Sequence, residues 1–112
     1  MDILIHSDGL VLTDAFRTAV EGKIGRVEQF APRALRARVR IRKLSARPSP
    51  RQYEVRVHCE IPGKDLTAEE RGPDALSALD TVAGKIERRL RKRKTNRLAK
   101  RERKNPRVKL KS

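Results

Sequence analysis

The residue types and spacings that most clearly suggest chemistry are cations near the carboxyl end of the chain. Four of them recur at i, i+3, i+4 and i+7, so a helix places them on one face. These are Lys85, Arg88, Arg89 and Lys92. Within residues 85–94 only Glu87 is acidic, whereas an ordinary solvated helix face mixes signs. A row of like charge can follow a phosphate backbone, so the pattern favours a polyanion-binding face.

Residues that could support catalysis are few and scattered. Cys59 falls on the inward side of an expected strand, where a free cysteine usually acts as a small hydrophobe. His6 and His58 lie far apart in the sequence, and neither has an obvious carboxylate partner. There is no glycine-rich phosphate loop, metal-ligand spacing or Ser/His/Asp arrangement. We therefore predict no catalytic residue, no metal, no cofactor and no enzyme activity.

Charge is distributed unevenly along the 112 residues. The whole chain holds 29 Lys and Arg against 14 Asp and Glu, a formal net charge of +15. Residues 1–84 hold 14 basic and 12 acidic side chains, whereas residues 85–112 hold 15 basic and 2 acidic. This predicts a near-neutral folded body followed by a cationic end, with an anionic partner.

The chain shows no feature that points to a membrane or to secretion. No apolar run approaches the roughly 20 residues that span a bilayer, and the amino terminus does not resemble a signal peptide. A single cysteine excludes an internal disulfide. We expect a cytoplasmic protein without a membrane partner or small-molecule substrate, monomeric when free.

The elements that must position the cations follow from hydrophobic periodicity. Strands are expected around Ile3 and Ile5, over 35–42 and 53–61, and around Leu66 and Ala68. The inward residues of the second strand would be Leu35, Ala37, Val39 and Ile41. Pro62 and Gly63 fit the centre of a type II turn between the last two strands.

Two amphipathic helices complete the pattern. One begins after the N-cap Thr13 and stops before Pro32, with an apolar stripe of Phe16, Val20, Ile24 and Val27. The other begins at Asp74, and its stripe is Leu76, Leu79, Val82, Ala83, Ile86 and Leu90. After Leu90 the stripe positions, Arg93, Lys94 and Arg97, are all basic.

The order β-α-β-β-β-α predicts an α+β sandwich in which both helices cover one face of a four-stranded sheet. The first two strands should be parallel across a right-handed crossover, and the rest should form an antiparallel meander. We assign one domain to residues 1–98 and a disordered basic tail to 99–112.

Other charged and aromatic residues give weaker indications. The four outward arginines of the second strand, Arg36, Arg38, Arg40 and Arg42, could touch RNA. They could equally pair with Glu54 and Glu60 on the neighbouring strand. Lys23 falls on the apolar stripe of its helix and must snorkel outward. Aromatic residues are scarce, so no base-stacking platform is expected on the sheet, and recognition should rest on phosphates and shape.

The sequence resembles the short ribosome hibernation promoting factors, also called ribosome-associated inhibitors, over residues 2–98. The resemblance lies in the element order and in two segments, residues 13–28 and 74–86. It implies a domain that binds the small ribosomal subunit and its rRNA between head and body, overlapping the paths of mRNA and tRNA. The family's RNA-contacting positions match Lys23, Arg26, Lys85, Arg89, Lys92 and Lys94, and Asp80 matches an acidic position.

Spacing and resemblance together give eight expected RNA-binding residues, and two other functions stay open. The eight are Lys23, Arg26, Lys85, Arg88, Arg89, Lys92, Arg93 and Lys94. Composition alone also fits a general double-stranded-RNA or nucleoid-binding protein. A structural ribosomal protein would share the basic carboxyl end.

Overall fold

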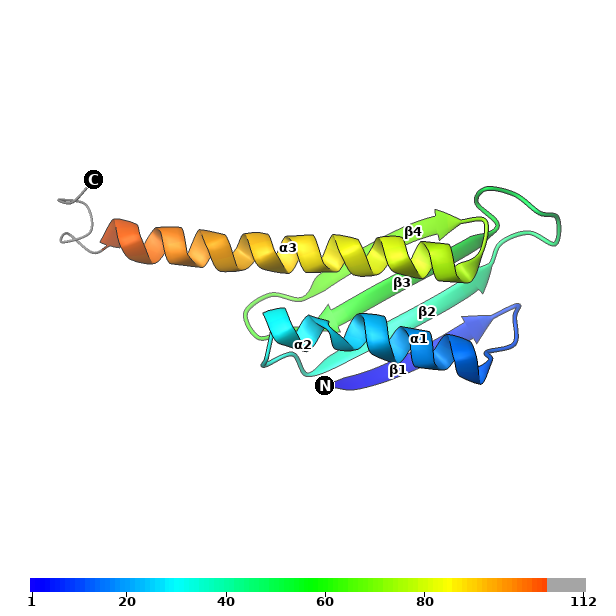
Figure 1. Ribbon diagram of the computed structural model, residues 1–112, viewed down its shortest axis with the longest axis horizontal. Helices are drawn as coiled ribbons and strands as arrows, with labels where there is room; N and C mark the ends of the chain where they lie inside the picture. Colours follow the sequence, from blue (N-terminus) through cyan, green and yellow to red (C-terminus); the bar gives the residue numbers. More distant parts are fainter. Residues whose placement is uncertain (105–112) are drawn as a thin grey trace.

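The α+β sandwich expected from the sequence is present in the computed structural model, which describes residues 1–104, with side chains described through residue 95. The elements are β1 (Asp2–Asp8), α1 (Asp14–Gly25), α2 (Val27–Phe30), β2 (Arg36–Lys43), β3 (Tyr53–Glu60), β4 (Leu66–Gly72) and α3 (Ala75–Lys104). The strands lie in the order β1-β2-β3-β4, with β1 parallel to β2 and the other pairs antiparallel. The helices cover one face of this sheet (Figure 1).

The core fills the space between the sheet and the helices. Alternate residues of β2 and β3 point into it, and Val39, Ile41, Val55 and Val57 are at most 1% exposed. Val20, Ile24, Leu79, Val82 and Ile86 meet them from α1 and α3. Burying each of these aliphatic side chains contributes roughly 1.5–3 kcal/mol. These inward-facing residues therefore hold the sheet and the helices together.

Two residues assigned to the core lie instead at the surface. Leu35 is 64% exposed, because β2 begins one residue later, at Arg36. Leu76 is 45% exposed in the first turn of α3, although the preceding Ala75 packs against the core, so Leu76 lies off the buried face of the helix. Both expectations were wrong because a residue near the start of an element can match its period without lying on its buried face.

The first helical segment is broken, where one continuous helix was expected. α1 begins after Thr13, whose hydroxyl accepts a hydrogen bond from the Phe16 amide at 3.1 Å, and it ends at Gly25. A separate turn, α2, follows and buries Val27. The Ala31 amide closes this turn by donating to the Val27 carbonyl at 2.8 Å. The break redirects the chain toward β2 while keeping Val27 in the core.

α3 continues well beyond the residues it buries. Asp74 caps it by accepting the Ser77 amide at 2.8 Å, which lowers the pKa of the Asp74 carboxyl. Leu90 is the last buried residue of its apolar stripe among the described side chains. The helix nevertheless runs to Lys104 and extends past the end of the sheet (Figure 1). Residues 91–104 contain no Gly or Pro and are rich in good helix formers.

The expected disordered tail must therefore be corrected for residues 99–104, which are helical. Residues 105–112, the remainder of that tail, lie outside the described residues. Over the described range, no helix is both long enough and apolar enough to cross a membrane.

Candidate nucleic-acid interface

Three of the expected RNA-binding residues form a regular series along strand β4. Lys85 donates to the carbonyl oxygen of Glu69 at 3.3 Å, and Arg89 donates to that of Thr67 at 2.6 Å. Arg93 donates to the carbonyl of Asp65 at 3.4 Å, just before β4 begins. We call Lys85, Arg89 and Arg93 the edge ladder.

The edge ladder forms because the helix and the strand repeat over similar distances. Four residues of helix advance about 6 Å and two residues of strand advance about 6.6 Å, so every fourth side chain meets every second carbonyl. β4 pairs with β3 on one side only, which leaves an edge with unpaired backbone groups. The edge ladder covers part of that edge with cations.

A carbonyl is neutral, so the arginines of the edge ladder keep their full charge for a further partner. Lys85 differs, because its ammonium also lies 2.7 Å from a carboxylate oxygen of Glu70. This contact is the main cause of the lowered pKa of Glu70. Lys85 is consequently the least available cation of the predicted row.

The remaining cations of α3 lie outside the ladder. Arg88, Lys92 and Lys94 are exposed, and none forms an ion pair with a described side chain. Arg88 contacts only the Gly84 carbonyl of its own helix, at 3.3 Å. Arg91 was not predicted as a site residue. It pairs with Glu87 at 3.5 Å and stacks over the Phe30 ring at 5.1 Å.

Lys23 and Arg26 lie close to α3, but each forms an ion pair with an acidic side chain of that helix. Lys23 forms an ion pair with Asp80, and Arg26 contacts Glu87 at 3.0 Å. These four side chains line a hollow of about 170 Å³ between α1 and α3. The pairs join the two helices, which gives Asp80 a structural role and leaves Lys23 and Arg26 less available to RNA than the α3 cations.

The four outward arginines of β2 are also paired. Arg36 and Arg38 contact Glu60 at 4.0 and 3.4 Å, and Arg42 contacts Glu54 at 3.7 Å. Arg40 contacts Asp8 of β1 at 3.0 Å, and this hydrogen bond is the main cause of the lowered pKa of Asp8. The cross-strand pairing with Glu54 and Glu60 is confirmed, so carboxylates partly offset the positive charge of these arginines.

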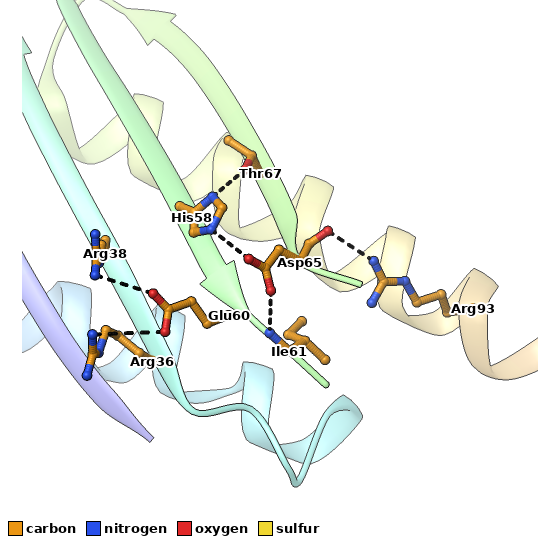
Figure 2. A network of polar contacts seen from close by, with 8 residues as sticks. All are labelled: Arg36, Arg38, His58, Glu60, Ile61, Asp65, Thr67 and Arg93. Carbon is orange, nitrogen blue, oxygen red and sulfur yellow. Dashed lines mark hydrogen bonds and ion pairs between the residues drawn. The ribbon is translucent and has the colours of Figure 1, made fainter. Parts of the chain in front are cut away.

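The histidines do have carboxylate partners, which corrects the prediction from sequence. Nε2 of His6 lies 3.0 Å from Oδ1 of Asp8 on the same strand. His58 lies between the Thr67 hydroxyl, 2.7 Å from Nδ1, and Asp65, 3.1 Å from Nε2. Figure 2 shows Asp65 at the centre of this network, where it also accepts the Ile61 amide at 3.1 Å.

The His58 network orders the turn between β3 and β4. Gly63 in this turn has φ +95°, the sign that the second central position of a type II turn requires. Through the Asp65 carbonyl, Arg93 ties α3 to the same turn (Figure 2). The network therefore fixes one end of the edge ladder.

Cys59 is fully buried, and desolvation raises the pKa of its thiol to about 11. Such a thiol stays protonated at neutral pH, as expected for a packing residue. Among the residues that the structure describes, no three His, Cys, Asp or Glu side chains gather to hold a metal ion.

An α+β body with a predominantly basic helix beside its sheet is typical of nucleic-acid-binding domains. Residues 3–98 match the family described as "Sigma 54 modulation protein / S30EA ribosomal protein". The chain belongs to this family, which confirms the resemblance stated from the sequence.

Individual relatives agree with the family assignment. The chain is 36% identical over 96 residues to a "Ribosome hibernation promotion factor" of Staphylococcus aureus. The match covers 81% of this chain but 47% of the relative, so the chain spans about half the length of that protein.

Two solved structures share the fold. The N-terminal domain of Protein Y from Thermus thermophilus superposes with a TM-score of 0.70 at 25% identity, covering 82% of this chain and 98% of that domain. A ribosomal subunit interface protein from Coxiella burnetii superposes with a TM-score of 0.73 at 20% identity. That match covers 85% of this chain and 99% of the other.

Proposed function

We propose that this domain binds the small ribosomal subunit and inhibits translation by occupying the channel of mRNA and tRNA, so that ribosomes hibernate under stress. The names of the relatives, a ribosome hibernation promotion factor and a ribosomal subunit interface protein, support this partner. The proposal requires no bond to be made or broken.

The observation that carries the proposal is the availability of the cations on α3. Arg88, Lys92 and Lys94 are exposed without an acidic partner among the described side chains, and Arg89 and Arg93 contact only neutral carbonyls. The arginines of β2, by contrast, are each within 4.0 Å of a carboxylate. RNA phosphates should therefore lie along α3.

In this arrangement the sheet acts as a scaffold and the helix layer faces RNA. Lys23 and Arg26 lie on the same layer, where they can contact phosphate at its margin if their pairs with Asp80 and Glu87 rearrange. Each phosphate that a cation neutralises releases counterions, so log affinity should fall linearly with log salt concentration, with a slope of about 0.9 per contact if the RNA behaves as a B-form duplex does.

The test is co-sedimentation of the full chain with purified ribosomal subunits at physiological salt. Binding should be confined to the small subunit and should survive an excess of unrelated double-stranded RNA. Equal binding to either subunit and to the competitor would contradict the proposal and favour a general double-stranded-RNA or nucleoid-binding protein. Presence at one copy per ribosome in growing cells, without accumulation on starvation, would favour a structural ribosomal protein.

Two matched triple variants locate the interface. Glutamine at Arg88, Lys92 and Lys94 should weaken small-subunit binding about tenfold or more and flatten its salt dependence. Glutamine at Arg36, Arg38 and Arg40 removes the same charge from the sheet face and should change binding little. Equal losses from both variants would show that the sheet also contacts RNA.

A further inference from the structure

A second hollow lies at the end of the domain, close to where α3 leaves the sheet. It has a volume of about 470 Å³, within the range of small-molecule sites. Part of its lining is apolar, and we call these residues the apolar floor: Phe30, Pro32, Ile61, Pro62 and Leu90. Three cations also line it, Arg33, Arg93 and Lys94.

The charge around this hollow has one sign. No acidic residue lines it, whereas the hollow between α1 and α3 holds both Asp80 and Glu87. Arg33 and Lys94 form no ion pair with a side chain that the structure describes, and Arg93 contacts only the Asp65 carbonyl. The site is therefore complementary to a ligand with an apolar body and a negative charge.

A nucleotide has this chemistry, because it joins a flat base to a phosphate. The base could contact the apolar floor while the phosphate contacts the cations that line the hollow. We propose that the hollow holds one nucleotide, with its base on the apolar floor and its phosphate on Arg33, Arg93 and Lys94. The proposal rests on the proposed function, because Arg93 and Lys94 are also among the α3 cations expected to contact RNA.

The packing of Phe30 suits a base-contacting role. Arg91 covers the ring from α3 at 5.1 Å and thereby restricts its orientation. The ring is half-buried, and it borders the hollow. A base can then meet an oriented aromatic group at the end of the domain, although the sheet offers no stacking platform.

The experiment is amide chemical-shift mapping of the full chain with four probes: adenosine monophosphate, ribose 5-phosphate, a short single-stranded RNA and a short acidic peptide. We expect amide shifts at Gln29, Ala31, Arg33 and Ile61, four residues that line the hollow. Shifts with the free nucleotide and the RNA would identify a general nucleotide site, and shifts with the RNA alone would identify a site for a strand. Arg33→Gln should weaken binding about tenfold, while Arg47→Gln, an equal charge change on the distant β2–β3 loop, should not.

Three results would overturn the proposal while leaving ribosome binding to be judged by sedimentation. The first is RNA binding to α3 without any shift around the hollow. The second is an equal response to ribose 5-phosphate and the nucleotide, because the base would then contribute nothing. The third is a response to a short acidic peptide and not to either base-containing probe.

Discussion

The guanidinium of Arg89 donates from Nη1 to the main-chain carbonyl of Thr67 at 2.6 Å, which joins the middle of α3 to the edge of the sheet. The same side chain is a predicted RNA contact. Structural and binding roles therefore meet in one residue, because a hydrogen bond to a neutral carbonyl leaves the positive charge in place.

Comparison with Lys92 separates these two roles. Arg89→Gln should lower ribosome affinity and also reduce the free energy of unfolding by about 1 kcal/mol, since the Thr67 carbonyl loses its donor. Lys92→Gln removes the same charge from an exposed position and should lower affinity alone. Denaturant unfolding and subunit sedimentation measure both effects. Equal stability of the two variants would show that the Thr67 contact contributes nothing.

Glu70 should stabilise the protein at neutral pH but not at acid pH. Lys85 holds the pKa of Glu70 below its ordinary value of 4.5, so this pair stabilises the folded state above about pH 4.5. The contribution is lost as the pH falls through the lower, folded-state pKa. Glu70→Gln should therefore be less stable than the parent near pH 7, with the difference shrinking toward pH 3.

Thermal melting across this pH range measures the effect, and Glu69→Gln is the matched control. Glu69 carries the same charge beside Glu70 but forms no ion pair with a described side chain. A constant difference between Glu70→Gln and the parent at all pH values would contradict the assigned role of the Lys85 pair.

The Cys59 thiol should resist alkylation in the folded protein. Burial raises its pKa from 9.0 to about 11, which lowers the thiolate fraction about a hundredfold before access is considered. Mass spectrometry after iodoacetamide treatment should show rapid labelling only in denaturant. Labelling of the native chain at the denatured rate would mean that the core around Cys59 opens readily.

Removal of residues 99–112 should leave a cooperatively folding domain. Leu90 is the last buried residue of the α3 stripe among the described side chains, and it is 3% exposed. Circular dichroism should show a single thermal transition close to that of the full chain. As a comparison, Leu90→Ala should cost about 2–5 kcal/mol. Loss of cooperativity after the truncation would show that residues 99–112 pack on the body.

The fold could be predicted from the sequence because the apolar residues of each helix and strand recur with the period of that element. The alternation around Val39 and Val57 predicted two adjacent strands, and their pairing brought Arg38 opposite His58 and beside Glu60. The Pro62–Gly63 turn was also identifiable, because few residues adopt the φ of Gly63.

The sequence did not show in the same way which cations pair with carboxylates and which stay available to RNA. The edge ladder depends on how closely α3 lies to β4, which helical periodicity does not contain. The pairing of Arg26 with Glu87 joins residues 61 positions apart. His6 and Asp8 were a simpler omission, since residues two apart on a strand share a face.

The central claim, inhibition by occupancy of the small-subunit channel, is tested most directly by titrating the chain into cell-free protein synthesis. We expect inhibition to saturate near one copy per ribosome and to be relieved by added mRNA and initiator tRNA, because they compete for the same space. Inhibition at far lower amounts, or cleavage of ribosomal RNA, would contradict occupancy and indicate an enzyme. Undiminished synthesis at several copies per ribosome would equally contradict it.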